Sequence, residues 1–174
     1  MALSLRDALI PGWLQVTASV RALVDKADDW CEQNGHSQAE MLGAKLAHDM
    51  LPFEYQVKSC WTHSAHALDC VKDGKFVPHM DPPPDSLDGL RVLLDKASET
   101  MQNTDTDALE QIAGNDMVFA IGENFRRNFT VQNFLLGFSQ PNFYFHAATA
   151  YDILRMKGLE IGKRDYLGQL PVED

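Results

Sequence analysis

Two polar side chains that could bind a metal ion or form a hydrogen-bonded network lie four residues apart in the last third of the chain. Asn142 and His146 belong to residues 130–158, which predict one long helix with Thr130 as its N-cap and Gly158 just past its end. On a helical wheel both side chains fall in the middle of the buried, apolar face. Because unpaired polar groups are costly inside a protein, this pair must have partners, and it is the best functional lead in the sequence.

The partners are expected on a second helix, predicted over residues 37–72 and interrupted by Pro52. The inward direction of this helix carries Asp49 and Gln56, whereas His48 lies roughly 100° away from it on the wheel. We therefore expect Asp49 and Gln56 to face the polar pair of the last helix. A shift of register at the proline would bring His48 there instead.

These residues support three interpretations of the site, of which the first two are the main ones. The first is a divalent-metal site with His146, Asn142, and His48 or Asp49 as mixed ligands, holding zinc, nickel or iron. The second is a buried polar network of Asp49, Gln56, Asn142 and His146 that holds two helices in register. The third is a metal-free pocket for a small-molecule ligand.

A competing metal cluster consists of Cys60, His63, His66 and Cys70. On a continuous helix the last three would share one side, but only His66 and Cys70 have the four-residue spacing usual for metal ligands on one helix, and no partners that would orient the ligands are evident. Cysteines are commonly small core residues, and histidines near a helix end are commonly solvated. We therefore prefer the structural interpretation of this cluster. No GxSxG, P-loop, GxGxxG or HExxH motif occurs, so hydrolase-elbow, nucleotide-binding and zincin functions have no support.

Bulk properties restrict the partners. The 174 residues fit a single domain, 1–174, and carry a net charge of −10, with a pI near 4.9. This acidity disfavours nucleic acid and anionic membranes as main partners. No apolar run is long enough to span a membrane, and the N-terminal residues lack the features of a signal peptide. Three cysteines without zinc-type spacing indicate reduced thiols, so we expect a cytoplasmic protein.

The elements that position these residues predict an all-α protein. Residues 4–34 and 86–104 have apolar residues at helical spacing, as do the two helices described above. Residues 117–129 change to a strand-like pattern around Gly122-Glu123-Asn124. The expected fold is an up-down four-helix bundle with a short β-hairpin before the last helix.

This order of elements, together with the segments LAHDMLPFEYQV, PNFYFHAATAYDILRMKG and GKRDYLG, resembles the DinB/YfiT-like superfamily. More narrowly, the chain is similar to a bacterial branch known only as a family of unknown function. Many members bind a divalent metal through three histidines, one in a Leu-Ala-His context and two in an HxxxH pair. Leu46-Ala47-His48 matches the first segment and His146 the second histidine of the pair. Asn142 stands in place of the first, and a neutral amide is a weaker ligand than imidazole.

The resemblance implies two functions of different classes. One is a divalent-metal-dependent enzyme of the thiol-transferase or hydrolase class, with Asp49 as a candidate base if it is not itself a ligand. The other is a dimeric helical scaffold or binding module whose former metal site has become a polar network. We favour the second. The homodimer is expected from the habit of the superfamily and from Tyr144 and Tyr151, which are placed to face a second subunit.

Overall fold

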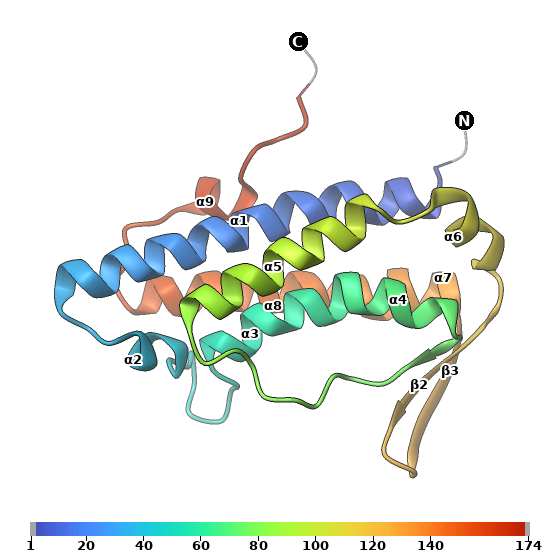
Figure 1. Ribbon diagram of the computed structural model, residues 1–174, viewed down its shortest axis with the longest axis horizontal. Helices are drawn as coiled ribbons and strands as arrows, with labels where there is room; N and C mark the ends of the chain where they lie inside the picture. The colour runs from blue at the N-terminus through green and yellow to red at the C-terminus, as the bar shows by residue number, and fades with distance from the viewer. Residues whose placement is uncertain (1–2, 173–174) are drawn as a thin grey trace.

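Four long helical segments lie side by side in this computed structural model, which describes residues 3–172 (Figure 1). Two of them contain a π-helical turn. The segments are α1 (Leu5–Asn34); α3 (Phe53–Trp61) continued by η1 (Thr62–His66) and α4 (Ala67–Lys72); α5 (Leu87–Gln102); and α7 (Val131–Phe134) continued by η2 (Leu135–Ser139) and α8 (Gln140–Met156). The shorter helices are α2 (Gln38–Leu42), α6 (Thr106–Ile112) and α9 (Lys163–Leu167).

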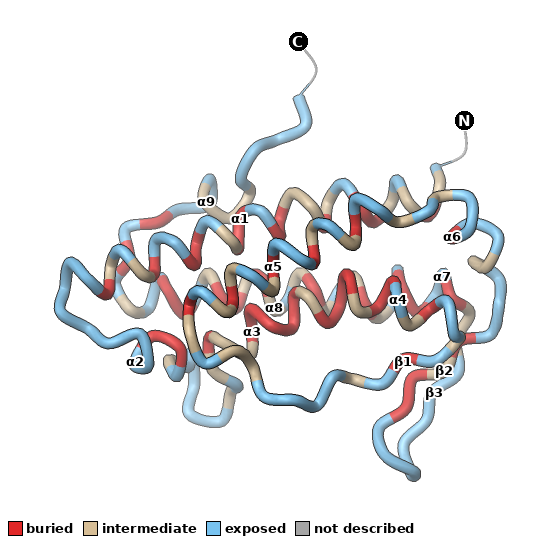
Figure 2. The backbone as a smooth tube through the Cα atoms, in the orientation of Figure 1, coloured by how far each residue is buried: buried red, intermediate tan, exposed pale blue. Residues whose placement is uncertain are grey.

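The first helix shows how local sequence sets these elements. Ser4 caps α1 by accepting a hydrogen bond from the N–H of Asp7 at 3.0 Å, which satisfies one free donor of the first turn. Gly35 ends the helix in a left-handed conformation with φ of 70°, which glycine adopts without steric cost. The buried residues of α1 recur at three- and four-residue spacing, so one face of the helix is directed at the core (Figure 2).

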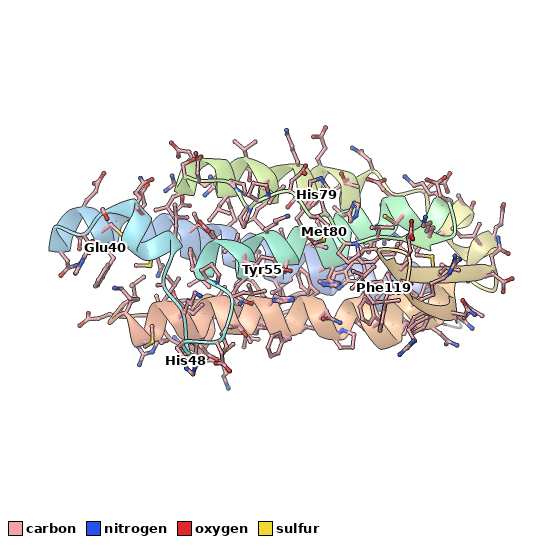
Figure 3. All side chains as sticks on the ribbon, turned by 90° about the horizontal axis from the view of Figure 1, so that it is seen from below. Glu40, His48, Tyr55, His79, Met80 and Phe119 are labelled. Carbon is pink, nitrogen blue, oxygen red and sulfur yellow. The ribbon has the colours of Figure 1, made fainter. Side chains whose placement is uncertain are left out.

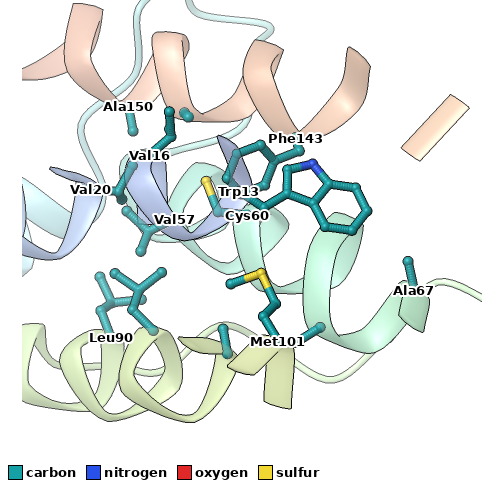
Figure 4. Close-up of a cluster of buried hydrophobic side chains, with 14 of the residues drawn as sticks. Trp13, Val16, Val20, Val57, Cys60, Ala67, Leu90, Met101, Phe143 and Ala150 are labelled. Atoms are coloured by element: carbon teal, nitrogen blue, oxygen red, sulfur yellow. The ribbon is translucent and has the colours of Figure 1, made fainter. Parts of the chain in front are cut away.

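The core fills the space between the four segments. Trp13 of α1 packs against Phe143 of α8 with ring centroids 6.0 Å apart, and both side chains are fully buried. Cys60 of α3 and Met101 of α5 belong to the same cluster, so all four segments contribute to it (Figure 4). Burial of this apolar surface is the main force that holds the helices together.

The expected helix over residues 37–72 is wrong in its first half. The helix α2 ends at Leu42, residues 43–52 form a loop, and α3 begins at Phe53. Pro52 has an extended backbone, with φ of −73° and ψ of 170°, and occupies the N-cap position of α3. Proline also disfavours the helical conformation of the residue before it, so Pro52 starts a new helix instead of kinking an old one.

A small sheet lies beside the α4 and α7 end of the helical segments and projects away from them (Figure 1). Strands β2 (Asp116–Ile121) and β3 (Phe125–Thr130) pair antiparallel, with Phe119 opposite Arg127. The short strand β1 (Lys75–Phe76) adds to β2 in parallel. The structure therefore has a three-stranded sheet where the sequence predicted a hairpin alone. Phe76 and Phe119 pack with centroids 5.8 Å apart, which joins the sheet to the core.

The segment between β1 and α5 runs along the outside of α3 and is rich in proline. It is attached by Lys58, whose ammonium group donates hydrogen bonds to the carbonyl oxygens of His79 and Asp81. The Lys58 side chain is buried, and this burial lowers its pKa. None of the helices in the described part of the chain is both long enough and apolar enough to cross a lipid bilayer.

Candidate functional site

A chain of hydrogen bonds joins α8 to α3 at His146. The Nδ1 atom of His146 lies 2.7 Å from Oε1 of Gln56, and Nε2 of Gln56 donates to the carbonyl oxygen of Leu51 at 2.8 Å. Because the Gln56 amide nitrogen is committed to this carbonyl, its oxygen is the acceptor for His146. Nδ1 of His146 therefore carries the proton and Nε2 retains a lone pair.

A second imidazole, which the sequence analysis did not connect with this site, stacks on the first. The rings of His63 and His146 are nearly parallel, at 9°, with centroids 5.6 Å apart. His63 is buried, and its Nδ1 atom has no hydrogen-bond partner within the described residues. Phe76 and Phe138 complete its surroundings, with ring centroids 5.9 and 5.7 Å from that of His63. The site is thus a pair of imidazoles with aromatic walls.

Both π-helical turns occur at this place. His63 belongs to η1 and Ser139 to η2, and the hydroxyl of Ser139 donates to the carbonyl oxygen of His63 at 3.1 Å. Turns of this kind are rare in proteins and are frequent at functional sites. Here they join the second and last long segments directly, next to the two imidazoles.

Burial keeps both imidazoles neutral. It lowers the pKa of His63 to about 3, an effect strengthened by the nearby His146 and His66, and it lowers the pKa of His146 to about 4. At neutral pH the two rings therefore offer lone pairs and N–H donors but no positive charge. Such a site can accept hydrogen bonds or ligate a cation, and it does not favour an anion.

Asn142, the polar residue expected beside His146, forms a hydrogen bond within its own helical segment instead. Asn142 is half-buried, and its Nδ2 atom donates to the carbonyl oxygen of Phe138 at 2.7 Å, one turn earlier. The structure therefore brings Gln56 and His146 together across the two segments, whereas the Asn142 amide donates within the last one.

The two remaining predicted residues lie outside the site. The side chains of His48 and Asp49 are 96% and 75% exposed, on the loop that precedes Pro52. Figure 3 shows His48 on this loop, well apart from Tyr55 of α3. The prediction that Asp49 points into the core is wrong, as is the alternative with His48, because both assumed a helix through residues that Pro52 excludes from it.

The metal implied by the DinB-like resemblance does not fit these residues. His48 is in solvent, and the oxygen of Gln56 is bonded to the Nδ1 proton of His146. Of the expected ligand set only the oxygen of Asn142 and Nε2 of His146 remain, which is fewer than the three protein ligands that an open zinc site has. Within residues 3–172, no group of three or more His, Cys, Asp or Glu side chains could hold a metal ion.

The members of the competing Cys and His cluster have different partners and do not form one site. His63 faces α8, whereas His66 stacks on Trp61 and its Nε2 atom lies 3.1 Å from the carbonyl oxygen of Val77. Cys70 lies 3.5 Å from the same nitrogen, but Cys60 is fully buried and its pKa is raised to about 12. The π-helical turn changes the direction of the residues after it, so a wheel of constant pitch could not separate His63 from His66.

The mostly helical fold with a small sheet is shared with a protein of known structure. A crystal structure of a DinB family member protein from Shewanella denitrificans matches it with a TM-score of 0.79 over 98% of this chain and 95% of that one. At 24% identity the likeness concerns the fold alone. This chain belongs to the DUF1993 family, a domain of unknown function, whose model matches residues 5–167. A comparison with curated proteins finds no match.

Proposed function

We propose that this protein is a helical scaffold or binding module in which the hydrogen bond between Gln56 and His146 has replaced a metal site. The observation that carries the proposal is the 2.7 Å contact between these side chains, with the Gln56 amide fixed by Leu51. The N–H donor of His146 and the carbonyl acceptor of Gln56, which face each other between α8 and α3, satisfy one another. Their role is to hold α3 and α8 in register in a part of the core where an unpaired polar group would be destabilising.

The local chemistry favours this function over the alternative, a divalent-metal-dependent enzyme. A general base works best with a pKa near the operating pH, whereas burial lowers the pKa of His146 to about 4. Asp49, the carboxylate considered as a base, is exposed on a loop. The stacked imidazoles therefore suit a structural or binding role.

The binding surface of this module is the outer face of α7 and α8, which takes a second copy of the chain. Residues 131–151 contain no Asp, Glu, Lys or Arg, although the protein has a net charge of −10. Leu136 and Phe145 are 39% and 56% exposed on this stretch. An uncharged, partly apolar face lets two acidic molecules approach without like-charge repulsion.

The tyrosines expected at a dimer interface do not contribute to this argument. Tyr144 packs beside Phe143 and Gly12, where a Cβ at Gly12 would lie only 2.6 Å from the tyrosine hydroxyl. Tyr151 packs on Tyr166 with centroids 6.0 Å apart. Both rings have partners within the chain, so the interface is proposed from Leu136 and Phe145 instead.

Substitution of His146 tests the network. We expect His146→Ala to lower the free energy of unfolding by about 1–3 kcal/mol, because the buried amide of Gln56 loses its partner. Protein purified without a nickel column should contain no stoichiometric zinc, nickel or iron by mass spectrometry. Urea denaturation measures the stability change. Stoichiometric metal in the native protein that disappears in His146→Ala, with unchanged stability, would overturn the proposal in favour of the enzyme.

A further inference from the structure

We infer that Gln56 and Asn142 are the two residues that decide against metal binding in this protein, and that histidines at these two positions would create a three-imidazole site for zinc or nickel with His146. This inference rests on the proposed function, because it takes the Gln56–His146 bond as the replacement for a metal site. It differs from the expectation of the sequence in assigning the position on the second long segment to Gln56 and not to His48.

The position of Gln56 is suitable for a ligand. Its Oε1 atom is 2.7 Å from Nδ1 of His146, and two nitrogen ligands of one tetrahedral zinc lie about 3.3 Å apart, given Zn–N bonds of about 2.0–2.1 Å. A small movement of the two side chains would therefore be enough for groups at these positions to share a cation instead of a hydrogen bond.

The position of Asn142 is suitable as well. It precedes His146 by four residues in the same continuous helix, α8, and residues at this spacing are neighbours on one face. Two histidines at this spacing are a common way to bind zinc. Because the Asn142 amide nitrogen bonds only to the carbonyl of Phe138, replacement by histidine leaves no side chain of another segment unpaired.

The surroundings already contain an acceptor for a new ligand. The carbonyl oxygen of Leu51 receives the N–H of Gln56 at 2.8 Å. Histidines that bind metals almost always donate their second ring N–H to a carbonyl or carboxylate, which fixes the orientation of the ring. An imidazole introduced at position 56 would have this carbonyl as its acceptor, whereas the amide of Gln56 supplies only a weak neutral oxygen to a cation.

The test is a gain of metal binding in the double variant Gln56→His and Asn142→His, purified without metal affinity. Calorimetric titration with Zn²⁺ and with Ni²⁺ should show one equivalent bound, at least 100-fold more tightly than by the native protein. Addition of His48→Ala should leave this affinity unchanged, and addition of His146→Ala should abolish it. The His48→Ala control decides between Gln56 and His48 as the ligand position.

The possible outcomes separate the inference from the proposed function. A folded double variant, as judged by circular dichroism, that binds no better than the native protein would overturn the inference alone, as would loss of binding on His48→Ala. Stoichiometric metal in the native protein would overturn the proposed function. If the double variant does not fold, the single variant Asn142→His decides: it should bind at least 10-fold more tightly than the native protein, and equal affinity would overturn the inference.

Discussion

At the scale of single residues, the site is defined by the hydrogen-bond partner of each polar side chain. The wheel reasoning that placed Gln56 and His146 on facing sides of two helices was sufficient to bring them together, because both lie in regular helix near their points of contact. It failed for Asp49, which lies before the proline that starts α3. It missed His63, because its orientation depends on a π-helical turn that no residue pattern announces.

The neutral histidines make the stability of the protein depend on pH. The pKa of both imidazoles is lowered by folding, to about 3 for His63 and about 4 for His146, from an ordinary value near 6.5. The unfolded chain therefore binds protons that the folded chain does not. The stabilisation is complete above about pH 6.5 and is lost as the pH falls towards 4, by about 1.4 kcal/mol per pH unit for each histidine.

Urea denaturation between about pH 7 and 5 measures this dependence, in a range above the titration of ordinary carboxylates. The variant His63→Phe retains an aromatic ring against His146 and removes one titrating group. It should reduce the slope of stability against pH by about half. A native protein that is equally stable at both ends of this range would show that these histidines are not buried in the neutral form.

At the scale of elements, capping residues and apolar periodicity predicted the helices well, whereas the breaks within the predicted helices could not be predicted. The first helix, the helix α5 and the long last segment could be predicted from Ser, Thr and Gly at their ends and from their apolar spacing. The loop before Pro52 could not, because proline allows either a kink or a new start. Strand β1 has only two residues and depends on β2, which is distant in sequence.

The contact between the two π-helical turns can be tested at Ser139. Its hydroxyl bonds to the carbonyl oxygen of His63 in a fully buried position. We expect Ser139→Ala to lower the free energy of unfolding by about 0.5–1.5 kcal/mol, because a buried hydrogen bond between the two segments is lost. Denaturation in urea gives the value.

A matched control for Ser139 is Ser98→Ala on α5. Ser98 also donates to a carbonyl, that of Leu94 at 3.1 Å, but within its own helix and in a partly exposed position. This substitution should change stability by no more than about 0.5 kcal/mol. Equal effects of the two substitutions would mean that the bond between the π-helical turns has no special importance.

At the scale of the whole molecule, charge is distributed unevenly. Ion pairs connect α1 and α5 through Arg91, which contacts Asp25 and Asp28 at 2.8 and 2.7 Å, and α9 is attached to α1 by Lys26 and Asp165 at 2.6 Å. The outer face of α7 and α8 has no charged residue up to Tyr151. This contrast is the basis for proposing that two copies meet on that face.

Sedimentation of a surface variant tests the dimer. Phe145 is 56% exposed, and Phe145→Asp would place a charge in the proposed interface, so we expect the dimer to dissociate into monomers. Val92→Asp is the matched control, since Val92 is 52% exposed on α5, and it should leave the dimer intact. A native protein that sediments as a monomer at all concentrations tested would contradict the proposal.

The attachment of the proline-rich segment by Lys58 has a consequence for how the protein tolerates sequence change. No main-chain hydrogen bond connects residues 77–85 to the rest of the described chain, and the ammonium group of Lys58 binds main-chain oxygens, which every amino acid possesses. The two hydrogen bonds of Lys58 therefore do not depend on which side chains this segment carries, whereas they do depend on the lysine. Related proteins should accordingly differ most in this outer crossing and keep a long cationic side chain beneath it.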